Sequence, residues 1–206
     1  MSRSMPRRLD RRGGWRGWAP QAGVAVLAML WGLTVTAADA SGLDELMALL
    51  AQRKHGVASF EQNQFLSVLK RPAHSSGTLT YDAPDHLEQR TLEPRAQSAV
   101  LDHGVLTMQV GGHERQLRLQ DYPQLAPMLD SILATLAGDR GTLERLFRLE
   151  FEGDLAHWRL LMRPLDTGLA AHVASIRVSG ERDAVLEVEV QQADGDRSVM
   201  SITPRE

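Results

Sequence analysis

The sequence predicts a mainly β protein with a few helices (α+β), built on an antiparallel sheet. From Val57 onward, apolar and polar residues alternate in short runs, the period of a strand with one buried face. Turn residues such as those in RPAHSSG, DHG and GGH separate the runs at short, regular distances. Two stretches with helical spacing, about 43–54 and 124–137, interrupt this pattern. Together these features indicate neighbouring antiparallel strands with helices packed on them.

The first forty residues have the composition of an export signal. Arginines precede the apolar run APQAGVAVLAMLWGLTV, and small residues follow at Ala38 and Ala40. We therefore expect a secretory signal peptide at 1–40, cleaved after about Ala40, and a single periplasmic domain at 41–206. The apolar run is shorter than the roughly 20 residues of a spanning helix, which disfavours the alternative of an uncleaved anchor. The sequence does not decide between general and twin-arginine export.

Charge and cysteine content exclude several classes of protein. Without the leader, 17 Lys and Arg stand against 24 Asp and Glu, a net charge near −7 with neutral histidine. Such a chain is poorly suited to nucleic acid. It also has no cysteine, which excludes disulfides, thiolate metal sites and lipidation of a cysteine at the cleavage point. We expect a soluble monomer, stabilised by its own core, that is not itself a lipoprotein.

The first half of this domain is predicted to be a helix followed by a meander. Ser41 is a possible N-cap for an amphipathic helix that ends near Gly56. A hairpin follows, with its two strands on either side of RPAHSSG. Further strands are expected around 86–92, 97–102, 105–110 and 114–120.

The second half is predicted to be a helix and then another group of strands. The helix at 124–137 should end at Gly138, and Thr142 is a candidate cap for a short helical turn to Leu146. Strands resume in RLEFEGD, AHWRLLMRP, HVASIRVSG, AVLEVEVQQ and RSVMSITP, which gives about ten or eleven strands in all. Because each has one apolar side, we expect a strongly curved sheet or barrel whose concave face the helices cover. Periodicity does not distinguish a filled core from a hollow one.

No pattern of residues indicates catalysis, a metal or a cofactor. The seven histidines are scattered, without a pair at i, i+4. The sequence has no G-x-S-x-G, phosphate-binding glycine loop or S-x-x-K, and SSG at 75–77 is interpreted as the end of a hairpin loop. We therefore expect no enzyme activity, no catalytic residue, no metal site and no cofactor.

Several short phrases, in their order, resemble the LolA-like periplasmic lipoprotein carriers (the LolA/LolB fold). The resemblance covers nearly all of the chain after residue 40 and implies an incomplete, strongly curved antiparallel β-barrel with a helical lid over an apolar cavity for acyl chains. One departure is Ala83, where the family typically has an arginine that holds the lid. A second is the absence of the family's aromatic residue after the proline. The phrases are ASFEQ (Ala58, Ser59, Phe60, Gln62), GTLTYDAP (Gly77, Leu79, Pro84) and WRLLMRP (Met162, Pro164).

The resemblance implies a chaperone in outer membrane biogenesis and protein transport. Its cargo would be lipoproteins, received from an inner-membrane release transporter and delivered to an outer-membrane acceptor. Two alternatives stay open: a carrier of the same fold for another acylated or polyene-type lipid, and a ligand-free β-barrel interaction module. Burial of an acyl chain is worth about 0.8 kcal/mol per CH₂ and requires no hydrogen bonds, so the lining should be apolar.

Candidate lining residues are those that share the apolar side of the predicted strands, and candidate lid residues are those on the apolar stripe of the second helix. The lining set is Phe60, Leu66, Leu79, Tyr81, Leu87, Leu106, Met108, Trp158, Leu160 and Met162, and the lid set is Leu125, Met128, Leu129, Ile132, Leu133 and Leu136.

Overall fold

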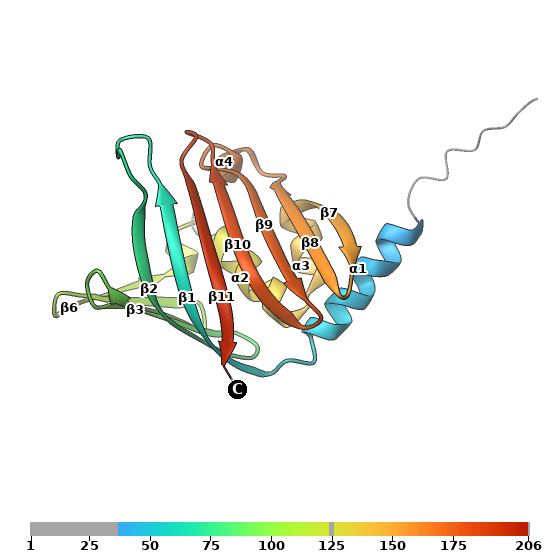
Figure 1. Ribbon diagram of the computed structural model, residues 1–206, viewed down its shortest axis with the longest axis horizontal. Helices are drawn as coiled ribbons and strands as arrows, with labels where there is room; N and C mark the ends of the chain where they lie inside the picture. The colour runs from blue at the N-terminus through green and yellow to red at the C-terminus, as the bar shows by residue number, and fades with distance from the viewer. Residues whose placement is uncertain (1–36, 124–125, 206) are drawn as a thin grey trace, which may run out of the picture. The chain divides into compact units, whose positions relative to one another are not determined.

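Eleven strands form one antiparallel sheet in the computed structural model, which describes residues 37–123 and 126–205, with side chains from Ser41 onward (Figure 1). The spatial order is β6-β5-β4-β3-β2-β1-β11-β10-β9-β8-β7. The strands are β1 (His55–Phe65), β2 (Ala73–Asp82), β3 (His86–Glu93), β4 (Gln97–Asp102), β5 (Val105–Val110), β6 (His113–Arg118), β7 (Phe147–Asp154), β8 (His157–Pro164), β9 (Val173–Glu181), β10 (Ala184–Gln192) and β11 (Arg197–Arg205).

The sheet consists of two meanders joined by the first and last strands. β1 pairs with β11, with Phe60 opposite Ile202. β6 and β7 lie at the two ends of the strand order. The predicted antiparallel sheet with helices is confirmed, but the sheet is open and does not close into a barrel.

Four α-helices and one 3₁₀ helix accompany the sheet in the described residues. They are α1 (Ala37–Leu50), η1 (Leu119–Asp121), α2 (Ala126–Ala137), α3 (Arg140–Leu146) and α4 (Thr167–Ala170). In Figure 1, α2 and α3 lie on the same side of the sheet. None of these helices has the length and apolar character needed to span a membrane.

The boundaries of the first helix and first hairpin differ from the prediction. Most of the predicted signal peptide lies outside the described residues, and α1 already begins at Ala37, before the expected cleavage site. The helix ends at Leu50, and Gly56, predicted as its stop, lies in β1. The hairpin loop is 66–72, so SSG at 75–77 belongs to β2 and not to the loop.

The cap of α3 also differs from the prediction. Asp139 is the N-cap, and its Oδ1 accepts a hydrogen bond of 2.9 Å from the backbone N–H of Thr142. The Thr142 hydroxyl donates a second bond to Asp139 Oδ2 at 2.5 Å. These bonds hold the pKa of Asp139 below its usual value, with the bond from the hydroxyl as the largest cause. Thr142 is therefore the donor to the cap, because a carboxylate three residues earlier accepts more strongly.

The main core lies where α1 and α3 cover the β7–β9 part of the sheet. Trp158 is only 2 % exposed, and its Nε1 donates a 2.9 Å hydrogen bond to the carbonyl of Arg182. Gly180 lies opposite Trp158 in the β8–β9 ladder and leaves room for the indole. The buried cluster is Leu43, Leu46, Met47, Leu50, Ala134, Leu143, Phe147, Trp158, Leu160, Met162, Leu169, Val173, Ile176 and Val178.

Candidate functional site

An apolar pocket lies between α2 and the middle of the sheet, beside the filled core. Its volume is about 390 Å³. From α2, four side chains line it: Met128, Leu129, Ile132 and Leu136. The other lining residues come from the end of α1, the segment before β1, the sheet and the β9–β10 turn: Leu50, Arg53, Gly56, Val57, Ala58, Gln62, Leu79, Tyr81, Leu87, Gln89, Ile176, Asp183, Val185, Val188, Val190, Ser198, Met200, Ile202 and Pro204.

The period of the strands explains most of the sheet wall. In β11, alternate residues from Ser198 to Pro204 face the pocket. In β10, Val188 and Val190 do the same, while Val185 joins them because the pairing with β9 shifts between Val185 and Glu187. Such a bulge changes the face to which the preceding residues point. Leu186, two residues before Val188, does not line this pocket and lies by a shallow depression on another part of the surface.

The structure brings about half of the candidate residues together at this pocket. Leu79, Tyr81 and Leu87 come from β2 and β3, and the four α2 residues face them. Leu133 is half-buried in α2 but does not line the pocket, and Leu125 lies outside the described residues.

The other candidate lining residues lie elsewhere. Trp158, Leu160 and Met162 belong to the packed core, because α1 and α3 occupy their side of β8. Phe60 is buried without lining the pocket. The remaining candidates are Leu66 in the β1–β2 loop, and Leu106 and Met108, which are half-buried in β5.

Several lining residues were missed by the sequence interpretation. Val188 and Val190 alternate with Glu187 and Glu189, and this period already marked their side as apolar. The signal that was lacking is the pairing of β1 with β11, which brings the last strands to the centre of the sheet. That pairing joins segments at opposite ends of the domain, so local patterns do not indicate it.

Most polar side chains at the pocket are paired with each other. Arg53 Nε and Nη2 both donate to Asp183 Oδ2, at 3.1 and 2.7 Å, and these bonds lower the pKa of Asp183. This pair connects the segment before β1 to the turn between β9 and β10. Deeper along β1, Gln62 Nε2 donates to the Ser198 hydroxyl at 2.6 Å.

Tyr81 has a buried hydroxyl that is not paired in this way. Its side chain lines the pocket and the residue is 5 % exposed, yet its hydroxyl oxygen is buried and has no hydrogen-bond partner among the described residues. Burial raises the pKa of this phenol, and the negative charge of Asp85 raises it further. The hydroxyl therefore stays protonated at neutral pH.

The sequence also matches a family of known proteins. The family model described as outer membrane lipoprotein carrier protein LolA-like matches residues 35–202. The chain belongs to the LolA-like family. This match spans more than half of the sequence and includes every residue that lines the pocket except Pro204. No curated protein matches the chain significantly.

Solved structures resemble this LolA-like chain at low sequence identity. The LolA superfamily protein NE2245 from Nitrosomonas europaea is 10 % identical, with a TM-score of 0.42 over 82 % of this chain and 94 % of that one. A chain of the Pseudomonas aeruginosa MucA/MucB complex is 16 % identical, with a TM-score of 0.45 over 79 % and 56 %. LprF from Mycobacterium bovis is 9 % identical, with a TM-score of 0.36 over 80 % and 93 %. The family assignment rests on the sequence match alone.

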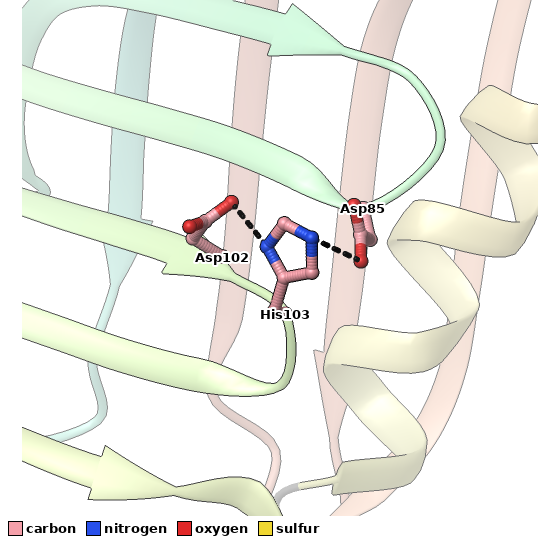
Figure 2. Close-up of side chains that lie close together, drawn as sticks. All are labelled: Asp85, Asp102 and His103. Atoms are coloured by element: carbon pink, nitrogen blue, oxygen red, sulfur yellow. Dashed lines mark ion pairs between the residues drawn. The ribbon is translucent and has the colours of Figure 1, made fainter.

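This LolA-like chain has an exposed polar cluster outside the pocket (Figure 2). Asp85, Asp102 and His103 are the one group of three potential metal ligands among the described residues. Figure 2 shows His103 between the two carboxylates. Its Nδ1 lies 3.0 Å from Asp102 Oδ1, and its Nε2 lies 3.9 Å from Asp85 Oδ2. His86 contacts Asp102 at 3.3 Å and is the largest cause of that carboxyl's lowered pKa. Surface ion pairs account for this geometry.

Proposed function

We propose that the protein is a carrier that holds the acyl chains of lipoproteins in the pocket between α2 and the sheet. One observation carries the proposal: an apolar pocket of about 390 Å³ lies in a chain of a lipoprotein-carrier family. Ligand pockets commonly have volumes of about 300–1,000 Å³, which includes this one. Aliphatic side chains dominate both walls, as a methylene chain requires.

The physical need for such a carrier follows from the solubility of its cargo. A sixteen-carbon chain resists transfer to water by roughly 12 kcal/mol, at about 0.8 kcal/mol per CH₂. Exported from the cytoplasm and monomeric in the periplasm, the protein would shield these chains between an inner-membrane release transporter and an outer-membrane acceptor. This role requires no catalytic residue, metal or cofactor.

We assign the role of lid to α2. Its four lining residues are half-buried, whereas the side chains of α1 that pack in the core are almost fully buried. Movement of α2 away from β10 and β11 would therefore expose less of the core than movement of α1. The lid would close without the arginine typical of the family, because Ala83 stands at that position. The backbone N–H of Ala83 donates a 2.9 Å hydrogen bond to the carbonyl of Lys54.

A ligand-free interaction module is less well supported than a carrier. Such a module needs a filled core on the whole inner side of the sheet. The core is filled under α1 and α3, but a pocket lies under α2. A carrier of another acylated or polyene-type lipid would use the same pocket, and the nature of the bound cargo separates it from a lipoprotein carrier.

Titration with a lipophilic fluorescent dye tests the proposal. The full-length gene is expressed, and the purified protein is stripped of lipid before the dye is added. We expect one saturable dye site, from which a triacylated lipopeptide displaces the dye at micromolar concentration or below. A dye signal that rises linearly without saturation, or one that no acylated compound reduces, would exclude an acyl-chain carrier.

A further inference from the structure

The connection between β1 and β2 exposes apolar side chains that the fold leaves uncovered. Six large apolar side chains are exposed in the described residues, and three of them, Phe65, Val68 and Leu69, lie in this one short segment. Val68 is the most exposed of the six, at 85 %. We call residues 65–71 the β1–β2 tip. Tight turns usually carry Gly, Asn, Asp or Ser, so turn chemistry does not explain a valine here.

Hydrogen bonds hold the β1–β2 tip in a defined turn. The N–H of Leu69 donates to the carbonyl of Leu66 at 2.9 Å. This bond closes a turn that has Ser67 and Val68 in its middle. The N–H of Ser67 donates to Asp196 Oδ1 at 2.7 Å and ties the turn to the β10–β11 connection. A binding partner would therefore meet apolar side chains that are already positioned, with little ordering cost.

Basic side chains adjoin this apolar turn. Lys70 and Arg71 follow it directly and are exposed, and the segment 66–74 contains no acidic residue. Two carboxylates, Asp194 and Asp196, belong to the facing β10–β11 turn, and each accepts a backbone N–H bond. The chain after residue 40 has 17 Lys and Arg against 24 Asp and Glu, so two adjacent exposed cations without an acidic neighbour in sequence are a local departure from an acidic protein.

Exposed apolar side chains beside cations are complementary to a phospholipid surface. The apolar groups enter the boundary of the acyl region, and the cations stay with anionic headgroups. A stable protein interface needs about 800 Å² from each partner, far more than one turn provides. A bilayer, in contrast, accepts a single protruding turn.

We propose that the β1–β2 tip docks the protein on a phospholipid membrane with anionic headgroups, with Val68 and Leu69 inserted and Lys70 and Arg71 at the headgroups. The proposal goes beyond the carrier function and does not depend on what the pocket holds. Ser198 of the pocket wall is adjacent to Arg197, whose guanidinium carbon lies 4.5 Å from the centre of the Phe65 ring. Docking would thus bring that end of the pocket near the bilayer.

Vesicle flotation with the purified protein tests the proposal. The vesicles contain phosphatidylcholine alone or an equal mixture of phosphatidylcholine and phosphatidylglycerol. We expect tighter binding to the mixed vesicles, weakened by high salt. The double variant Val68→Ser/Leu69→Ser should bind the mixed vesicles at least about tenfold less tightly, because its apolar insertion is lost. Lys70→Gln and Arg71→Gln should each reduce binding about fivefold.

Leu92 provides a matched control. It is 55 % exposed in β3, outside the β1–β2 tip, so Leu92→Ser should bind vesicles as the wild type does. All these variants change exposed side chains and should keep the thermal unfolding temperature of the wild type. Displacement of the lipophilic dye by a triacylated lipopeptide should also be unchanged in them, which separates the β1–β2 tip from the pocket.

A fluorescent label reports which part of the protein meets the bilayer. The chain has no cysteine, so Ser67→Cys provides a unique site for an environment-sensitive dye. Its emission should shift to the blue with mixed vesicles. A label at Glu181→Cys, an exposed position at the other end of the sheet, should show no such shift.

Several results would overturn the proposal. These are no binding of the wild type to mixed vesicles, equal binding of Val68→Ser/Leu69→Ser, or an equal loss in Leu92→Ser. Self-association that the double variant abolishes, without vesicle binding, would make the β1–β2 tip a protein interface and would also refute membrane docking. Each of these results leaves the carrier function standing, whereas failure of the lipopeptide to displace the dye contradicts the carrier alone.

Discussion

Gly180 is a residue whose lack of a side chain determines how the core packs. A Cβ at this position would lie 2.0 Å from the carbonyl oxygen of Ala184 and 2.5 Å from Cζ2 of Trp158. Trp158 fills this space and donates to the carbonyl of Arg182. The β9–β10 hairpin and the indole are therefore fitted to each other at Gly180, and any side chain there must displace one of them.

Gly180→Ala should lower the free energy of unfolding by about 1–3 kcal/mol, the usual cost of overpacking a core. Urea unfolding followed by circular dichroism measures this. Gly141→Ala is the control, because a Cβ there would meet nothing closer than 3.5 Å and alanine favours the α3 helix. Stability equal to the wild type in Gly180→Ala would show that the indole is not tightly packed.

The Arg53–Asp183 pair gives a pH-dependent contribution at the residue scale. The hydrogen bonds from Arg53 lower the pKa of Asp183 from 3.8 in the folded state, so the charged form is the stabilising one. Its contribution is fully present above pH 3.8 and is lost as the pH falls through the lower folded pKa. The pair is partly exposed, so we expect Asp183→Asn to lose about 0.5–1 kcal/mol at pH 7.

Urea unfolding of the wild type and Asp183→Asn at several pH values checks this expectation. The difference between them should be constant from pH 7 to about pH 5 and shrink below pH 3.8. Glu45→Gln, a change at an exposed position of α1, should show no such difference. If the difference in unfolding free energy between the wild type and Asp183→Asn persists at the lowest pH, the effect comes from the altered side chain and not from the ion pair.

The four α2 side chains provide a test at the scale of the element. If α2 is a lid, Leu129→Asp or Ile132→Asp should weaken acyl-lipid binding at least tenfold, because a carboxylate would be desolvated against the acyl chain. Their unfolding free energy should fall by less than that of a core change such as Leu160→Asp. Dye displacement and urea unfolding give the two quantities.

Leu133 provides the control within the same helix. It is half-buried but does not line the pocket, so Leu133→Asp should change stability without a comparable loss of binding. If all three aspartate variants lose binding in proportion to stability, α2 is a structural part of the core and not a lid.

At the scale of the whole molecule, the sequence predicted the strands and helices better than it predicted which helices pack on which part of the sheet. The strands at 97–102 and 105–110 have the predicted bounds, because their alternation and turn glycines are local signals. The burial of Trp158 was also expected from its strand. The sequence did not predict that α1 and α3 pack against the side of β8 that carries Trp158. Trp158 therefore lies in a packed core and not in a cavity.

The remaining differences have physical reasons that lie outside local patterns. The β-bulge after Val185 changes which residues of β10 face inward, so Val185 lines the pocket and Leu186 does not. The unpartnered hydroxyl of Tyr81 is visible only in three dimensions, because its absence of partners depends on every neighbouring element. Alternation had marked Tyr81 only as an apolar lining residue.

Photochemical crosslinking tests the central claim that the pocket under α2 holds an acyl chain. A monoacylglycerol with a diazirine in its chain is bound to the purified protein, irradiated, and its attachment sites are mapped by mass spectrometry. We predict saturable crosslinks to α2 near Leu129 and Ile132 and to the facing strands near Val188 and Met200, reduced by excess unlabelled lipid. Crosslinks confined to β7 or to the exposed β1–β2 loop, or crosslinks that excess lipid does not reduce, would contradict it.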